Sequence, residues 1–161
     1  MHRLRTIFGI HDDLQVFAED WLNRPSQLLS AVSLSRADGA LVTVLYRDDR
    51  FQVELCAVPG GLVIPAHTHP NADTIEVGVS GALRLIVNDI DVFAGIPDET
   101  LVRLNRWRGI RINHDDVHGT VVGEPGAMFM SIQRWNGCAP KSVLTDYEGG
   151  ALGPQHEEML A

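Results

Sequence analysis

Short apolar segments separated by turn residues fill most of this chain. Strands at regular spacing with turn signals between them are typical of a β-sandwich or barrel, and not of a parallel α/β sheet. The turns expected from the sequence are Asp38-Gly39, Asp48-Asp49, Pro59-Gly60-Gly61, Ser80-Gly81 and Asn88-Asp89. The strands expected between and after them are 28–34, 40–46, 51–58, 62–67, 74–79, 82–87, 110–113, 120–122 and 127–133. The pattern therefore predicts an all-β fold.

The two ends of the chain show different patterns. Apolar residues recur at helical spacing between Leu14 and Leu22, after the acidic pair Asp12-Asp13, and Pro25 follows. This predicts a short N-terminal helix. From Asn136 onward isolated apolar residues lie among glycines, prolines and acids, which predicts an extended tail. We thus expect a helical segment at 1–26, a barrel at 27–136 and a tail at 137–161.

Residues 97–109 are harder to assign, because charged and apolar residues alternate there with no clean period. We interpret this stretch as a linker strand between two halves of the barrel. It contains Arg103, Arg106 and Arg108, and Arg111 follows. Guanidinium groups bind carboxylates and phosphates, so one interpretation is that one of these arginines faces a ligand pocket. The alternative is that they form a solvated strand face that balances local acids or lies in a subunit contact.

Composition limits the partners of the chain. Its 161 residues are 45% hydrophobic and carry 13 basic against 21 acidic side chains, a net charge of −8. That charge repels phosphate backbones and anionic membranes, so we expect neither nucleic acid nor a membrane as partner. We see no long apolar run and no N-terminal leader, which makes a cytoplasmic location the default expectation. Cys56 and Cys138 form no disulfide framework, and we expect Cys56 to be a buried thiol.

The run from Gly61 to Gly81, GLVIPAHTHPNADTIEVGVSG, contains the candidate metal-binding residues. His67 and His69 stand at positions i and i+2 at the end of an apolar segment, and side chains at this spacing share one face of a strand. Two imidazoles directed at one point suit a first-row metal ion. His118, about fifty residues further on, follows a second strand and turn and is the candidate third ligand.

This segment resembles the first sequence motif of the cupin superfamily, in which a glycine, a His-x-His pair, a glutamate and a second glycine follow at set spacing. Gly61, His67, His69 and Gly81 fall in register with it. Gly109–Gly119 resembles the second cupin motif and assigns His118 to the third histidine position. The resemblance covers about residues 40–135 and implies a small RmlC-like cupin: a double-stranded β-helix, or jelly-roll barrel, that often holds a metal.

The second motif departs from the usual cupin pattern in its turn. Asn113 stands where the motif has proline and Asp115 where it has glycine. Both residue types tolerate left-handed turns, so we expect the turn to persist with His114 inside it. A turn histidine is more often solvated or bonded to backbone than bound to metal.

The sequence leaves three alternatives for the fourth metal ligand. Thr74 occupies the position of the usual glutamate, and Glu76 lies two residues further along the same face, about 6.6 Å away. We favour Glu76. If the face of Asp73, Ile75, Val77 and Val79 points inward instead, Asp73 is the nearest acid and Glu76 is solvated. A three-histidine site completed by water is the third alternative.

The resemblance implies a divalent transition metal (Fe, Mn, Ni, Cu or Zn), bound by His67, His69, Glu76 and His118. Our first hypothesis is a small metal-dependent enzyme, dioxygenase-like, acting on a small oxygenated metabolite inside the barrel. The alternative is a non-catalytic metal-binding or ligand-sensing cupin. A third is a structural barrel whose histidines form hydrogen bonds without a metal. Edge strands and terminal arms also predict a homodimer.

Overall fold

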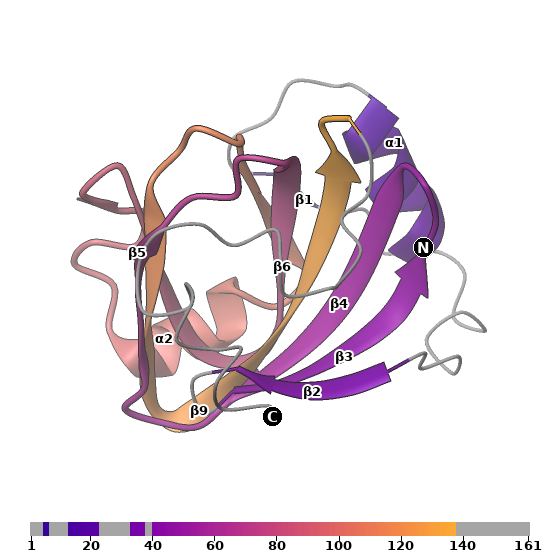
Figure 1. The fold of residues 1–161 in the computed structure, drawn as a ribbon. Helices are drawn as coiled ribbons and strands as arrows, with labels where there is room; N and C mark the ends of the chain where they lie inside the picture. The colour runs from indigo at the N-terminus through magenta and orange to yellow at the C-terminus, as the bar shows by residue number, and fades with distance from the viewer. Residues whose placement is uncertain (1–4, 7–12, 23–32, 38–39, 138–161) are drawn as a thin grey trace.

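The computed structural model describes residues 5–6, 13–22, 33–37 and 40–137 (Figure 1). Its elements are β1 (Arg5–Thr6), α1 (Asp13–Leu22), β2 (Ser33–Ala37), β3 (Ala40–Arg47), β4 (Phe51–Val58), β5 (Val63–His67), β6 (Ala72–Val87), β7 (Ile90–Asp91), α2 (Asp98–Leu104), β8 (Arg108–Ile112) and β9 (His118–Trp135). The all-β prediction is confirmed, as is the N-terminal helix. The predicted tail, Cys138 and part of the predicted strand 28–34 lie outside the described residues.

Two long strands, β6 and β9, organise the sheet. They pair antiparallel along nearly their whole length, from Ala72↔Trp135 to Val87↔His118. The first half of β6 and the second half of β9 lie in the strand order β1-β8-β6-β9-β4-β3-β2. Their other halves pair with β7 and β5. The sheet therefore curls so that one pair of strands contributes to both sides of the barrel (Figure 1).

Glycines allow these two strands to bend without ending. The backbone φ is +82° at Gly81 and +76° at Gly126, values that side-chain-bearing residues rarely adopt. A Cβ on Gly81 would lie 2.0 Å from the carbonyl oxygen of Gly126. The prediction that Ser80-Gly81 is a turn between two strands is therefore wrong, as is the division of β9 into two. The glycines redirect one continuous strand, and the ladder shifts register beside them.

Two apolar clusters occupy opposite faces of the sheet. Val53, Ile75 and Ile132 pack outward against Leu14 and Ala18 of α1, all of them fully buried. The inward cluster includes Val42, Cys56, Leu83, Val122 and Phe129, with Leu62 and Ile64 against it. Because side chains alternate along a strand, each central strand buries one set of residues under the helix and the other inside the barrel. The predicted burial of Cys56 is confirmed.

Helix α2 replaces the linker strand expected at 97–109. Pro97 precedes it with extended backbone, and Asp98 and Glu99 occupy its first turn, where negative charge is favourable. Leu101 is fully buried. A helix of seven residues completes fewer than two turns, so its apolar period is too short to recognise in the sequence.

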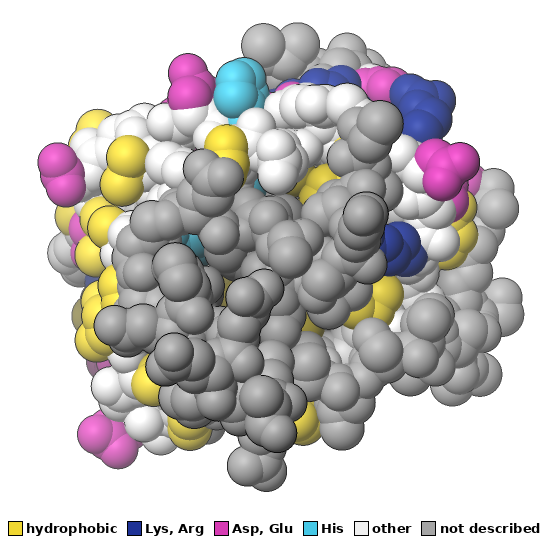
Figure 2. Space-filling model, viewed as in Figure 1, with side chains coloured by type: hydrophobic (Ala, Val, Ile, Leu, Met, Phe, Trp, Pro, Cys, Tyr) yellow, Lys and Arg dark blue, Asp and Glu magenta, His cyan; other side chains and the backbone are white. Residues whose placement is uncertain are grey.

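The surface view shows how the charged side chains are distributed on one face of the molecule (Figure 2). On the face in Figure 2, the basic side chains of the described residues have acidic ones among them. Within the described part of the chain, no helix has the length and apolar character needed to cross a membrane.

Candidate metal centre

Three histidines meet where β5 and β9 begin or end. His67 is the last residue of β5, His118 is the first of β9, and the antiparallel ladder places them opposite each other. His69 follows two residues after His67. One ring nitrogen from each histidine lies within 4.8 Å of the other two. All three side chains are buried. The predicted convergence of imidazoles from two distant segments is therefore present in the structure.

Backbone carbonyls fix the orientation of two of these rings. Nδ1 of His67 lies 2.8 Å from the carbonyl oxygen of Pro65, and Nδ1 of His118 lies 3.2 Å from that of Asp116. A carbonyl oxygen accepts hydrogen bonds and cannot donate them, so each Nδ1 carries the proton. In a neutral ring the lone pair then lies on Nε2, the usual arrangement when an outer hydrogen bond orients a metal-binding histidine.

Burial keeps the rings neutral. Burial first, and repulsion from His67 second, together lower the pKa of His69 to about 3. Burial, followed by repulsion from His69 and His67, outweighs the opposing effect of Asp116 and lowers the pKa of His118 to about 3. At neutral pH these imidazoles therefore offer lone pairs, the form that binds a cation.

The spacing of the rings also fits a cation. The Nε2 atoms of His67 and His69 are 3.1 Å apart. Two nitrogens each about 2.0–2.1 Å from one metal ion, at tetrahedral or octahedral angles, lie about 3 Å apart. The spacing of this pair is thus the one that a shared first-row metal ion requires, and the third imidazole lies within 4.8 Å of both.

The turn that precedes His118 is held by side-chain hydrogen bonds. Asp116 accepts from the backbone N–H and the amide of Asn113, at 2.8 and 2.9 Å, and from the amide of Asn88, at 2.7 Å. The amide oxygen of Asn88 accepts from the N–H of Val117 at 3.0 Å. The turn survives without the usual proline and glycine, as predicted, because these polar groups stabilise it.

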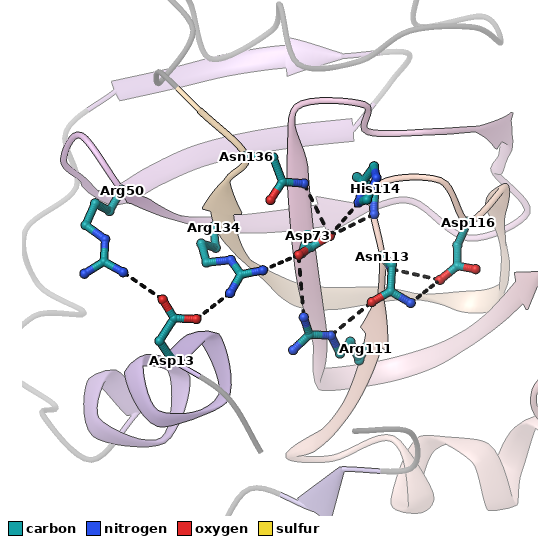
Figure 3. A network of polar contacts seen from close by, with 9 residues as sticks. All are labelled: Asp13, Arg50, Asp73, Arg111, Asn113, His114, Asp116, Arg134 and Asn136. Atoms are coloured by element: carbon teal, nitrogen blue, oxygen red, sulfur yellow. Dashed lines mark hydrogen bonds and ion pairs between the residues drawn. The ribbon is translucent and has the colours of Figure 1, made fainter. Parts of the chain in front are cut away.

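Asp73 lies at the centre of a second network, drawn in Figure 3. It accepts from the backbone N–H of His114 at 3.0 Å and from Arg134, and Arg111 lies 3.6 Å away. Burial opposes ionisation, but the hydrogen bonds outweigh it and lower the pKa of Asp73. Arg134 also bonds Asp13 of α1. For Arg111 the interpretation as a balance to nearby acid is confirmed, and His114 lies in its turn as predicted.

Glu76 is buried but is not in the histidine group. Its Oε1 accepts from the Ser131 hydroxyl at 2.8 Å, and its Oε2 has no hydrogen-bond partner. Burial raises its pKa to about 7. The expectation that an inward Asp73 face would leave Glu76 solvated does not apply, because α1 covers that face and Glu76 lies on the other. The four-ligand set that includes Glu76 stays a prediction.

Sequence reasoning missed several polar residues near Glu76. Gln52, Glu54, Ser131 and Gln133 are all buried on the sheet. Their alternation with apolar residues in β4 and β9 is visible in the sequence, but such alternation normally indicates a solvated face. The alternating pattern was therefore visible, but it indicated solvent exposure where the structure buries these side chains.

Comparison with known proteins supports the fold. No model of a known protein family matches the sequence, and no curated protein matches it either. Solved structures do match. An RmlC-like cupin from Shewanella frigidimarina NCIMB 400 has a TM-score of 0.52 at 12% identity, covering 63% of this chain and 82% of its own.

Two further structures are similar. A protein with a double-stranded β-helix domain from Klebsiella pneumoniae subsp. pneumoniae MGH 78578 has a TM-score of 0.52 at 18% identity, covering 70% of this chain and 84% of its own. PAC13 from Streptomyces, solved with uridine, has a TM-score of 0.53 at 15% identity, covering 75% and 85%.

The curled sheet and its buried histidines define a small β-barrel of the double-stranded β-helix class. This is the cupin fold of RmlC-like proteins, as the two motifs predicted. The fold itself leaves the reaction open, because one scaffold serves many functions.

Proposed function

We propose that this chain is a metal-dependent cupin enzyme that acts on a small oxygenated metabolite inside its barrel. The observation that carries the proposal is the pair of Nε2 atoms 3.1 Å apart, with Nδ1 of His67 and of His118 engaged by backbone carbonyls. A structural role would be served by hydrogen bonds between the rings and their surroundings. It would not require three buried rings that each bring one nitrogen within 4.8 Å of the other two.

His67, His69 and His118 would hold the metal, with Glu76 as the predicted fourth ligand. Bound there with an open position, Fe, Mn, Ni, Cu or Zn would polarise a substrate oxygen, and a redox-active member of this set would support dioxygen-dependent oxidation. The protein contributes orientation through the carbonyls of Pro65 and Asp116. Burial of the rings excludes water, which strengthens every electrostatic interaction at the site.

Elemental analysis tests the metal site before any substrate is guessed. Protein purified without an affinity tag should retain about one equivalent of a first-row metal per chain. His67→Ala and His118→Ala should each lose it, because two imidazoles bind more weakly than three. His114→Ala is the matched control and should retain the metal, since His114 lies in the turn bonded to Asp73. A wild-type protein that retains no Fe, Mn, Ni, Cu or Zn would contradict the proposal.

Oxygen consumption tests the dioxygenase-like chemistry. The Fe-loaded protein should consume dioxygen when the correct small oxygenated metabolite is supplied, and the His118→Ala variant should not. Turnover of a substrate without oxygen consumption would support an enzymatic function and exclude the dioxygenase-like reaction.

A non-catalytic metal-binding or sensing module is the second candidate. It is favoured by Thr74 at the position of the usual glutamate and by the bond between Glu76 and Ser131. The Thr74→Glu variant separates the two functions in part. Tighter metal binding without gain of any activity would favour the binding module.

We also propose a homodimer. In the described part of the sheet, β1 and β2 stand at the two ends of the strand order, and unpaired strand edges favour association. Light scattering on the eluted protein should give twice the mass of the chain.

A further inference from the structure

Six polar side chains form two rows across three neighbouring strands. Each row takes one residue from β4, one from β9 and one from β6, opposite each other in the ladders. The first row is Gln52, Gln133 and Thr74, and the second is Glu54, Ser131 and Glu76. Five of the six are at most 2% exposed and Glu76 is 8% exposed. We call these six residues the polar floor.

The polar floor faces the inside of the barrel. Residues two apart on a strand share a face, so Glu54 and Ser131 point the same way as Cys56 and Phe129. Those two residues belong to the inward cluster, against which Leu62 and Ile64 pack from the other side of the barrel. Burial raises the pKa of the Cys56 thiol, and the charges of Glu54 and Glu76 raise it further, which agrees with both carboxylates lying close to it.

One member of the first row, Thr74, is close in sequence to His69. Thr74 is near the start of β6, the end that connects to His69. The carbonyl oxygen of His69 accepts a hydrogen bond from the N–H of Ala72 at 3.0 Å, just before the strand begins. The histidine cluster and the polar floor are therefore joined by a short, hydrogen-bonded connection.

Hydrogen bonds within the polar floor satisfy part of it. Gln52 donates to Glu54 at 2.6 Å and to Gln133 at 3.1 Å. Gln133 donates to Ser131 at 3.3 Å, and Ser131 donates to Glu76 at 2.8 Å. Two buried oxygens remain without a partner, Oγ1 of Thr74 and Oε2 of Glu76. Burying an unbonded polar atom destabilises a protein, so these two oxygens are the atoms of the polar floor to which a bound ligand would add hydrogen bonds.

We propose that the polar floor binds a neutral small molecule rich in hydroxyl groups, such as a sugar or the ribose of a nucleoside. Carboxylates accept hydrogen bonds from hydroxyls, carboxamides donate and accept, and the threonine hydroxyl does both. Arg47 donates to Oε1 of Gln52 at 2.6 Å, so one cation borders the polar floor. The six residues themselves include two carboxyl groups and no Lys or Arg, which disfavours an anionic ligand. The inference rests on the proposed function in that it assigns the substrate class of the same barrel, but binding is measurable without turnover.

Thr74→Val tests the polar floor because it removes the hydroxyl at nearly constant volume. Calorimetric titration of the full-length protein with D-ribose, uridine and D-glucuronate would measure affinity. We expect ribose or uridine to bind wild type and to bind Thr74→Val at least about five-fold more weakly, the scale of one lost hydrogen bond. The melting temperature of the ligand-free variant should equal or exceed that of wild type. Thr74→Ser, which keeps the hydroxyl, should retain the affinity.

Thr43→Val is the matched control. Thr43 lies on β3 opposite Leu55, which packs against the outward cluster, so removal of its hydroxyl should leave binding unchanged. Weakened binding in both variants would overturn the inference. So would a lower melting temperature of Thr74→Val, which would assign the hydroxyl to structural water, or tighter binding of D-glucuronate than of ribose.

Metal content measured on the same samples separates this inference from the proposed function. A metal-free wild type that binds ribose through Thr74 would support the polar floor and contradict the metal centre. A wild type that retains metal while binding neither ribose nor uridine would overturn the polar floor and leave the metal centre standing.

Discussion

Glu76 should make the stability of the metal-free protein fall as pH rises. Burial raises the pKa of its carboxyl group from 4.5 to about 7, so the folded protein binds a proton that the unfolded chain releases. The stabilisation is fully present below about pH 4.5 and is lost as pH rises through about 7. A pKa difference of this size corresponds to about 3 kcal/mol of unfolding free energy, because each pH unit contributes about 1.4 kcal/mol.

The Glu76→Gln variant measures this effect directly. Glutamine has nearly the same shape, can still accept from Ser131 and does not titrate. Urea unfolding with a chelator present, followed by tryptophan fluorescence, should be compared at about pH 5 and about pH 8. Between these values the wild type should lose about 2–3 kcal/mol relative to the variant, because part of the total is already lost at pH 5.

Other titrating groups cancel in this comparison. Asp73, His69 and His118 are present in both proteins and shift both stabilities alike. Glu124→Gln is the control, since Glu124 is exposed on β9, and it measures what the replacement of a glutamate by glutamine does to stability by itself. The reasoning is refuted if the difference between wild type and Glu76→Gln is the same at both pH values.

Three other predictions concern packing, the strand bend and the metal. Leu14→Ala should cost about 2–5 kcal/mol in urea unfolding, because Leu14 is fully buried, whereas Val16→Ala, 55% exposed, should cost little. Gly81→Ala should lower the free energy of unfolding by about 2 kcal/mol or more, since its Cβ would meet a carbonyl oxygen at 2.0 Å. Gly95→Ala has a similar φ but open space around the Cβ, so it should lower the free energy of unfolding by less. Equal losses in the two variants would contradict the steric explanation. A chelator should lower the melting temperature of metal-loaded wild type and leave that of His67→Ala unchanged.

The sequence predicted best where local spacing determines geometry. His67 ends β5 and His69 follows two residues later, so their ring centroids lie 5.0 Å apart, and α1 follows from apolar residues at helical spacing. The pairing of His67 with His118 is a long-range contact, and the cupin motifs supplied it where periodicity could not.

The errors have physical causes that lie beyond local spacing. Ser80-Gly81 looks like a turn, yet Gly81 bends a continuous strand because its partner near Gly126 bends with it. Gln52 and Glu54 alternate with apolar residues as on a half-exposed strand. In a barrel covered by a helix both faces are buried, so alternation cannot show which face is the interior. The same ambiguity left Glu76 and Asp73 as competing ligands.

The strand pairing that places His67 opposite His118 also has a consequence for how the sequence of such a chain can change during evolution. Because main-chain pairing sets the distance between these two strand ends, the approach of the two imidazoles does not depend on which side chains line the inside of the barrel. Substitutions further along β4, β6 and β9 can therefore change the interior of the barrel while leaving the histidine pair in place. If the proposed metal site is correct, a scaffold of this kind can change its ligand without rebuilding that site.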